Sequence, residues 1–202
     1  MSKSEETRQK ILETTTWLIG KYGIEKTSLS KIATSIGMQK PSIYYYYSSK
    51  EELIDAVFCW ILEGYSFEKY FHINEYTKEN FIEKLISDGL QMLNEETTDT
   101  QALVVQVLNE FLLYGSRESS HNKEYRLVIK TLQEGFINGF ITLLQKGIEL
   151  GILNSNGLRE KACVLALTLD NISNYPMIGI QIDIAAVWTE TIASVLSKKE
   201  GI

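Results

Sequence analysis

Side chains that can donate hydrogen bonds to nucleic acid are concentrated in one short segment, residues 27–53, of this 202-residue chain. The donors are Ser28, Gln39, Lys40, Ser42 and Tyr44. Hydroxyl, amide and ammonium groups bind phosphate oxygens and the edges of bases in the grooves of DNA. The segment therefore predicts a surface that contacts double-stranded DNA.

Two short helices joined by a glycine turn are expected to position these donors. Thr27 and Ser28 are candidates for the N-cap of the first helix, and Gly37 supplies the turn. The second helix ends in the four tyrosines at 44–47, and a longer helix starts just after residues 48–49. The contacts between the two short helices would come from Ile32, Ala33, Ile36 and Ile43. This helix-turn-helix pattern suits the major groove of B-form DNA, which is about 12 Å wide and admits one α-helix.

Residues 11–53 resemble the N-terminal domain of the TetR (TetR/AcrR) family of one-component bacterial transcriptional regulators. The matching positions are Ile11, Leu12, Gly23, Thr27, Ile32, Ala33, Gly37, Tyr44, Lys50, Glu51 and Leu53. The resemblance implies an all-α fold in two parts. Residues 1–49 would be a three-helix DNA-binding domain, and residues 50–202 a helical bundle for ligand binding and dimerisation.

The resemblance also implies which residues contact DNA and how. Those expected to hold phosphates are Thr27, Ser28, Tyr45 and Lys50. Those expected at or near the floor of the major groove are Gln39, Lys40, Ser42 and Tyr44. Lys50 also begins the next helix, whose N-terminal dipole favours an anion.

Three departures from the family pattern are found in this segment. Thr14 and Thr15 replace two alanines, and Tyr46 and Tyr47 replace His-Phe, without breaking the architecture. Pro41 replaces a frequent glycine early in the recognition helix, where a proline is tolerated. Its ring would offer DNA an apolar surface, suited to a thymine methyl group, in place of a backbone N–H.

The charge of the chain is unevenly distributed. Residues 1–50 carry eight Lys and Arg against four Glu, a net charge of +4, and the other residues carry twelve against 22 acidic residues, a net charge of −10. A DNA-binding head on an acidic body would show this asymmetry, because phosphates attract the head and repel the body. Scatter in surface charge is the alternative explanation.

Apolar residues recur at helical spacing through the whole chain, whose two prolines are Pro41 and Pro176. An all-α fold of about nine helices follows. Beyond the two short helices, the expected spans are 5–22, 50–71, 77–93, 100–115, 123–150, 158–173 and 183–199. The helix at 50–71 would connect the DNA-binding head to the body.

The last two predicted helices carry wide apolar faces. One short recognition helix contacts few base pairs, so we expect a homodimer that reads two half-sites of a palindromic operator, about 34–36 Å apart or more. The residues expected in the dimer interface are Leu165, Leu169, Ile172, Val187, Trp188, Thr191 and Val195. Packing of these faces within one chain is the alternative.

Aromatic and amide side chains after residue 50 are candidates for a ligand pocket, since pockets in helical bundles are mostly apolar with a few polar groups. The candidates are Trp60, Tyr65, Gln106, Asn109, Phe111, Tyr114, Phe136, Phe140, Asn171 and Asn174. Each has a structural alternative, because helix-spaced aromatic residues also form cores and amides also form structural hydrogen bonds. No charged residue stands out as a counter-ion, so we expect an apolar or neutral small-molecule effector.

Other classes of protein find little support. The two histidines, His72 and His121, belong to no HExxH or Glu-x-x-His pair and accompany no nucleophile motif, so an enzyme is not expected. Cys59 and Cys163 lack metal-ligand spacing and are expected to be buried free thiols. We also expect no cofactor, no signal peptide and no apolar run of the ~18 residues that span a membrane. The expected location is the cytoplasm.

Together these patterns predict a transcriptional regulator, and the resemblance implies a ligand-responsive repressor. Effector binding in the body would shift the helix after residue 50 so that the two heads no longer match the half-sites. A ligand-dependent activator with the same fold is one alternative. A constitutive DNA-binding or adaptor protein without an effector pocket is another.

Overall fold

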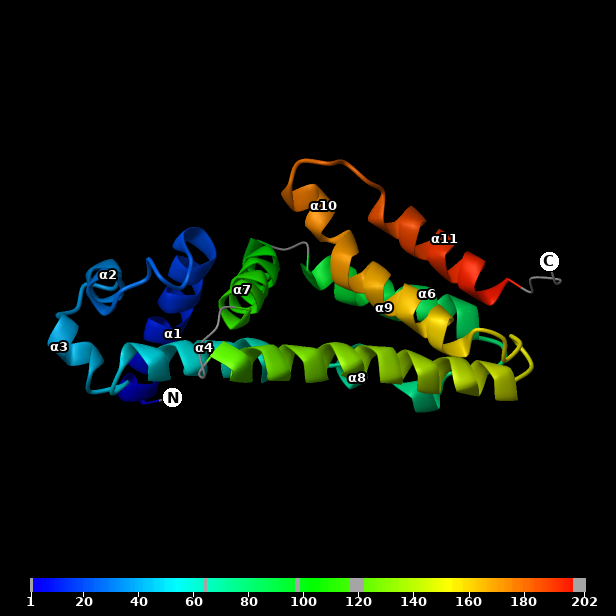
Figure 1. Cartoon of the computed structure of the whole chain (residues 1–202), viewed down its shortest axis with the longest axis horizontal. Helices are drawn as coiled ribbons and strands as arrows, with labels where there is room; N and C mark the ends of the chain where they lie inside the picture. Colours follow the sequence, from blue (N-terminus) through cyan, green and yellow to red (C-terminus); the bar gives the residue numbers. More distant parts are fainter. Residues whose placement is uncertain (1, 64, 97–98, 117–121, 198–202) are drawn as a thin grey trace. The chain divides into compact units, whose positions relative to one another are not determined.

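The computed structural model describes residues 2–63, 65–96, 99–116 and 122–197 (Figure 1). Within these ranges every regular element is helical, which confirms the predicted fold class. There are eleven α-helices and one 3-10 helix, and two of the α-helices, α5 and α10, are single turns that the sequence analysis did not anticipate. The other nine correspond to the nine expected helices.

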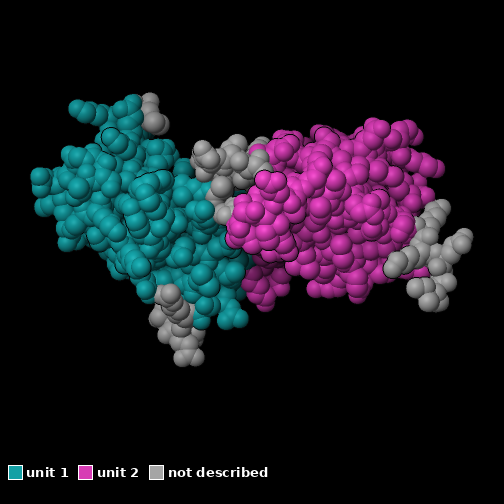
Figure 2. Space-filling model, turned by 90° about the horizontal axis from the view of Figure 1, so that it is seen from above, with its two compact units in different colours: residues 1–65, 99–129 teal, residues 66–98, 130–202 magenta. Residues whose placement is uncertain are grey.

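The chain forms two compact units (Figure 2). Unit 1 consists of residues 1–65 and 99–129, and unit 2 of residues 66–98 and 130–202. This grouping places more of the chain with the N-terminal helices than the expected boundary after residue 49 does. The assignment of DNA binding to one part and of ligand binding and dimerisation to the other stays a prediction.

Unit 1 is built around the N-terminal helix. Its helices are α1 (Lys3–Tyr22), α2 (Leu29–Ser35), α3 (Lys40–Ile43), α4 (Lys50–Glu63), α7 (Asp99–Gly115) and the first turns of α8 (Asn122–Glu149). α1 begins at a capping box, in which Ser2 and Glu5 exchange hydrogen bonds, and ends at Gly23. The φ angle of 82° at Gly23 explains why a glycine stands there.

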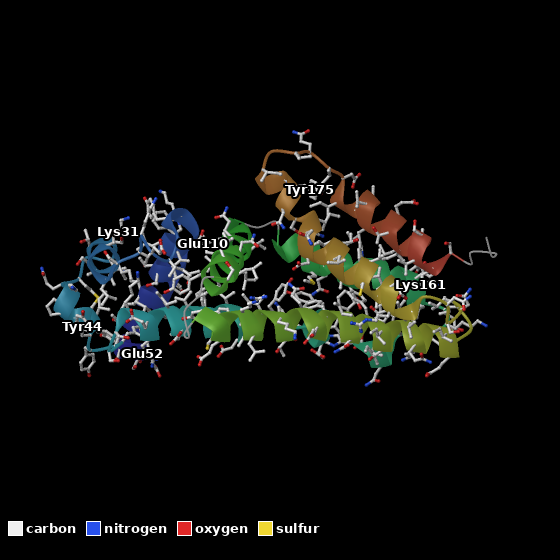
Figure 3. The ribbon with its side chains drawn as sticks, viewed as in Figure 1. Lys31, Tyr44, Glu52, Glu110, Lys161 and Tyr175 are labelled. Atoms are coloured by element: carbon white, nitrogen blue, oxygen red, sulfur yellow. The ribbon has the colours of Figure 1, made fainter. Side chains whose placement is uncertain are left out.

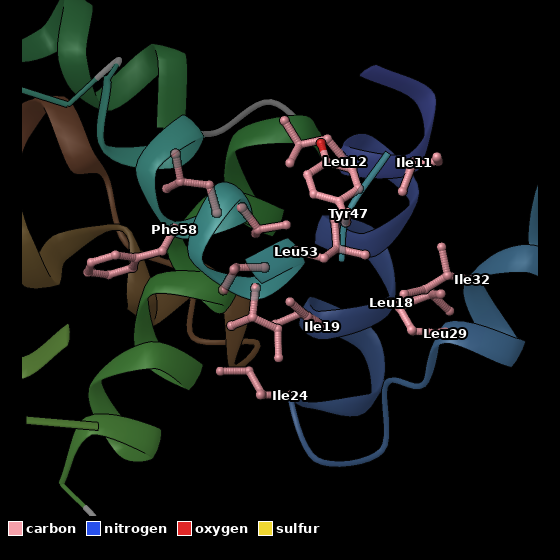
Figure 4. Close-up of a cluster of buried hydrophobic side chains, with 14 of the residues drawn as sticks. Ile11, Leu12, Leu18, Ile19, Ile24, Leu29, Ile32, Tyr47, Leu53 and Phe58 are labelled. Carbon is pink, nitrogen blue, oxygen red and sulfur yellow. The ribbon is translucent and has the colours of Figure 1, made fainter. Parts of the chain in front are cut away.

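The core of unit 1 joins side chains from these helices (Figure 4). Three of its helices contribute fully buried side chains, which are Ile11 and Ile19 of α1, Ile43 of α3 and Leu53 of α4. α7 packs against both α1 and α4. Thr15, which replaces a family alanine, is also buried, and its hydroxyl donates to the carbonyl of Ile11 at 2.7 Å, so the core holds no unpaired polar group there.

Unit 2 is held by an aromatic cluster and one tryptophan. Its elements are α5 (Phe67–Tyr70), η1 (Ile73–Glu75), α6 (Phe81–Glu96), the rest of α8, α9 (Leu158–Ile172), α10 (Asn174–Met177) and α11 (Ile184–Leu196). The ring of Phe67 stacks on Phe71 and meets Phe140 edge-on, with centroids 4.7 and 5.0 Å apart. Trp188 of α11 donates to the carbonyl of Ile86 at 3.2 Å and lies so close to Gly89 that a Cβ there would clash.

Two predicted helix spans were wrong, for local reasons. The helix expected to run from 50 to 71 ends at Glu63, because Ser66 is extended (φ −143°, ψ 156°) and a separate turn, α5, follows. The helix expected from residue 77 starts at Phe81, because Thr77 and Asn80 bond to each other ahead of it, with Thr77 N to Asn80 Oδ1 at 2.7 Å. The other helices lie within about two residues of the expected spans, although the expected end at 199 falls outside the described residues.

Two further expectations, on the burial of the cysteines and on long apolar runs, also need correction. Cys59 is exposed and Cys163 half-buried, so neither is the buried thiol that was expected. Residues 124–149 of α8 are long and apolar enough, by length and composition, to cross a membrane. Within unit 2, however, α8 buries Phe136, Phe140 and Leu143 against its own chain, as a core helix does.

Candidate nucleic-acid interface

The start of α2 and the turn between α2 and α3 are fixed by residues that the sequence analysis identified, Ser28 and Gly37. Ser28 is the N-cap of α2, and its hydroxyl oxygen accepts a hydrogen bond from the N–H of Lys31 at 3.2 Å. α2 ends where Gly37 takes a φ of 71° and the N–H of Met38 bonds to the carbonyl of Ala33 at 2.9 Å. Nothing lies within 4 Å of a Cβ built at Gly37, so the backbone conformation alone requires the glycine.

α3 divides the residues after the turn into an outward and an inward set. Ile43 and Tyr47 are buried, with 0 % and 2 % of their surface exposed. The exposed residues are Gln39, Lys40, Ser42, Tyr44 and Tyr45. Pro41 lies in the first turn of α3, where its missing N–H leaves no bond unmade. The structure therefore brings five of the eight predicted DNA-binding residues onto one short exposed segment.

Gln39 and the two exposed tyrosines are available to a partner. Gln39 is the N-cap of α3, yet its side chain makes no capping hydrogen bond. Tyr44 and Tyr45 have 48 % and 82 % of their surface exposed. Amide and phenol groups in such positions can bind bases or phosphates.

The inward tyrosine of this run is anchored to α1. The guanidinium of Arg8 lies 5.1 Å from the centroid of the Tyr47 ring, and Arg8 Nε donates to the Tyr47 hydroxyl at 3.4 Å. The turn into α4 is closed separately, because Glu52 accepts from the N–H of Ser48 at 2.6 Å. The hydrogen bonds from Ser48 also lower the pKa of the Glu52 carboxyl. These contacts fix the C-terminal end of the α3 segment.

Lys50 is tied to its own chain. Its ammonium donates to the carbonyl of Ile24 at 2.9 Å, and the carbonyl of Glu25 lies at 3.5 Å. Burial lowers the pKa of Lys50 from its usual value. Lys50 thus fastens the start of α4 to the loop between α1 and α2, and its expected contact with a phosphate stays a prediction.

Thr27 is corrected from a phosphate ligand to a structural residue. Only 1 % of its surface is exposed, and its hydroxyl donates to the carbonyl of Gly23 at 2.9 Å. The hydroxyl closes the loop that leads into α2 and faces away from solvent. Ser28, one residue later, is exposed, and its expected contact with a phosphate stays a prediction.

The predicted ligand-binding residues are divided between the two units. Trp60, Tyr65, Gln106, Asn109, Phe111 and Tyr114 belong to unit 1, and Phe136, Phe140, Asn171 and Asn174 to unit 2. Phe111 and Phe140 are fully buried and packed on other rings, Phe111 on Phe58 at 4.7 Å, so they are core residues and were wrongly placed in a pocket. Asn171 is exposed and donates to the carbonyl of Leu167 in its own helix. For the remaining residues, ligand binding stays a prediction.

The predicted dimer interface is largely internal. Leu165, Leu169, Ile172, Trp188 and Val195 are each at most 5 % exposed and pack within unit 2, where α9 contacts α11 and α11 contacts α6. Helical periodicity identified apolar residues but could not tell which of two faces the chain itself buries. Of the predicted set, Val187 has 40 % of its surface exposed, and Thr191 is half-buried.

α9 and α11 also carry an exposed apolar strip, called here the outer strip. The sequence alone did not distinguish it from the apolar face that unit 2 buries. Val164 and Leu167 of α9 have 46 % and 60 % of their surface exposed. Val164 also lines a groove of about 480 Å³ with Val187 and Thr191 of α11. A neighbouring cavity of about 500 Å³ extends from Val164 toward Asn154 and Lys161. The spacing of Val164 and Leu167, three apart on one helix, is the signal that could have identified this strip.

The described residues contain no cluster of metal-ligating side chains. In that part of the chain, no three His, Cys, Asp or Glu side chains are grouped as metal ligands. The exposed residues of α3 carry hydrogen-bond donors and one positive charge, which are the groups that a nucleic-acid interface uses.

Comparison with known proteins identifies relatives of the helix-turn-helix segment. The family model for bacterial regulatory proteins of the tetR family matches residues 11–57, which cover α2, α3 and the turn between them. An uncharacterized HTH-type transcriptional regulator of Bacillus subtilis, YfiR, is 26 % identical over 147 residues, which are 73 % of this chain and 68 % of that protein.

Solved structures share the fold over nearly the whole chain. The fatty acid degradation regulator FadR from Bacillus halodurans has a TM-score of 0.69 at 21 % identity, covering 99 % of this chain and 98 % of its own. The regulator AibR, solved with isovaleryl coenzyme A and operator DNA, has a TM-score of 0.68 at 16 % identity, covering 94 % and 97 %. The matched helix-turn-helix segment thus resembles that of the tetR family of bacterial regulatory proteins, and the solved structures show that the chain shares their fold.

Proposed function

We propose that this protein is a ligand-responsive repressor, which binds a palindromic operator as a homodimer and is released by a small, largely apolar effector. The observation that carries DNA binding is the division of residues at α3, where Ile43 and Tyr47 anchor the segment while Gln39, Lys40 and Tyr44 are exposed. Because the backbone is anchored, the segment can present these side chains to base edges without first having to fold. A bacterial protein that acts on DNA works in the cytoplasm.

The homodimer is proposed to form through the outer strip of α9 and α11. Val164, Leu167 and Val187 expose apolar surface there and line or flank a groove. The same strip on a second copy would fill that groove, as an isologous interface requires. Two heads would then read two half-sites, which explains how a helix as short as α3 could specify an operator.

The effector is proposed to be a small molecule with a largely apolar acyl chain. Proteins of the same fold include one named as a regulator of fatty acid degradation and one that holds isovaleryl coenzyme A. Among the predicted pocket residues, Trp60, Tyr65 and Tyr114 are half-buried and could contact such a molecule. Fatty acids and acyl coenzyme A esters are therefore the first probes to try.

Selection of random genomic fragments by the purified full chain at about 0.15 M salt, followed by sequencing, tests the proposal. A palindromic motif with two half-sites is the expected result. Addition of the probes should then lower the affinity for the selected fragment, and an increase in affinity would indicate an activator or co-repressor mechanism instead. Retention of fragments without any motif, or of none, would contradict sequence-specific regulation.

A further inference from the structure

Lys31 of α2 has an unusual environment for a surface lysine. Its ammonium nitrogen lies 4.2 Å from the centroid of the Tyr22 ring and donates a hydrogen bond to the carbonyl of Lys26 at 3.3 Å. Both partners precede α2 in the chain, so the side chain is drawn toward the start of its own helix. Figure 3 labels Lys31 on α2 and Tyr44 beyond α3, two exposed positions of the same small domain.

The ammonium keeps a charge that no acidic group neutralises. In the described residues, no carboxylate lies within 4.0 Å of Lys31 or of its neighbour Lys26, and the recorded ion pairs involve other lysines. A lysine ammonium has three N–H donors, and the Lys26 carbonyl uses one. The charge and the remaining donors are free to meet an anion.

Ser28, the N-cap of α2, provides a second donor three residues before Lys31. Its hydroxyl oxygen accepts from the N–H of Lys31 at 3.2 Å, which leaves the hydroxyl proton to be donated elsewhere. Ser28 is exposed, and Tyr22 has 40 % of its surface exposed. An exposed hydroxyl and an uncompensated ammonium, carried by residues of the same helix start, are groups that bind DNA phosphates.

We propose that Lys31 is a phosphate-binding residue of the DNA interface, adjacent to Ser28, and that Tyr22 is a positioning residue that holds the Lys31 ammonium near the start of α2. The inference rests on the proposed operator binding and adds a contact to it that carries no sequence information. The aromatic face orders a flexible side chain before DNA arrives, so less entropy is lost on binding.

The first test compares Lys31→Gln with wild type in the salt dependence of operator binding. Each phosphate contact contributes about 0.9 to the slope of log K against log salt, so two heads lose about 1.8. Between 50 and 200 mM salt, wild type should therefore lose about 12-fold more affinity than Lys31→Gln. Lys31→Arg should keep the wild-type slope. The matched control is Lys130→Gln, which removes the same charge from an exposed position on α8.

The second test examines Tyr22 through a double-mutant cycle. Tyr22→Leu should weaken operator binding when Lys31 is present and have no effect in the Lys31→Gln background, whereas Tyr22→Phe should bind as wild type does. Thermal melting of each variant checks that the fold is intact. If Tyr22→Leu weakens binding equally in both backgrounds, Tyr22 does not act through Lys31 and its positioning role is overturned.

The outcomes separate this inference from the proposed function. If wild type binds its operator but Lys31→Gln keeps the wild-type slope, only the Lys31 contact is overturned. If Lys130→Gln lowers the slope as much as Lys31→Gln does, the effect is one of net charge and the contact is again overturned. If wild type binds no DNA, the proposed function fails and takes this inference with it.

Discussion

Leu167 and Leu165 lie two residues apart on α9 and are expected to respond in opposite ways to replacement by alanine. Leu167 has 60 % of its surface exposed, and Leu165 has none. If the outer strip of α9 and α11 forms the dimer, Leu167→Ala should weaken dimerisation with little effect on the fold. Leu165→Ala should destabilise the fold, by about 2–5 kcal/mol, through the cavity it leaves in unit 2.

The size of the effect at Leu167 follows from its exposure. Leu→Ala removes about three CH₂ equivalents at ~0.8 kcal/mol each. Since 60 % of the side chain is still exposed in one chain, about 1.4 kcal/mol per copy remains to be gained in a dimer. A two-fold interface contains the residue twice, so the loss is about 3 kcal/mol, or roughly 100-fold in the dissociation constant.

Sedimentation equilibrium over a range of protein concentrations measures the dissociation constant, and thermal melting measures the fold. The expected pattern is a roughly 100-fold weaker dimer for Leu167→Ala with a melting curve close to that of wild type. A dimer that is unaffected by Leu167→Ala, or by the harsher Leu167→Glu, would refute the assignment of this strip to the interface. A chain that is monomeric at all concentrations would refute the dimer itself.

Three further predictions concern unit 1. Lys50→Ala is expected to weaken binding to all DNA sequences and to reduce the salt slope, which would establish a phosphate contact. A lower melting temperature with an unchanged slope would instead show that Lys50 acts only through its bonds to the carbonyls of Ile24 and Glu25. Gln39→Ala and Lys40→Ala should change the preferred operator sequence in a repeated fragment selection while the melting curve stays as in wild type, and an unchanged motif would contradict base contacts there. Burial, and after it the hydrogen bond to Asp55, raises the pKa of the Tyr125 hydroxyl, so the stabilisation by Tyr125 is full below about pH 10, its unfolded pKa, and is lost as the pH rises further. Tyr125→Phe should therefore be less stable than wild type near pH 7 but lose less stability on going to about pH 11. Urea unfolding at both pH values measures this difference.

Local patterns in the sequence were sufficient for the helix-turn-helix segment. Ser28 caps α2 and Gly37 takes a positive φ, as their residue types indicated, because caps and turns depend on atoms within a few residues. The burial of Ile43 among exposed donors could be predicted for the same reason. The ends of longer helices were less predictable: α4 stops at Glu63 although helical spacing of apolar residues continues beyond it.

What the sequence by itself determined is therefore the all-α fold, the helix-turn-helix and the exposed donors of α3, since each depends on local backbone preferences and on helical periodicity. What only the tertiary structure decided is which polar groups are already engaged and which apolar face is covered. The hydroxyl of Thr27 already donates to the carbonyl of Gly23, and the ammonium of Lys50 to that of Ile24, which residue type alone does not reveal. Leu165 and Leu167 are the same residue type two positions apart, yet the packing of α9 on α11 buries Leu165 and leaves Leu167 exposed. Burial depends on neighbours that are distant in the chain, so residue type alone could not distinguish the two.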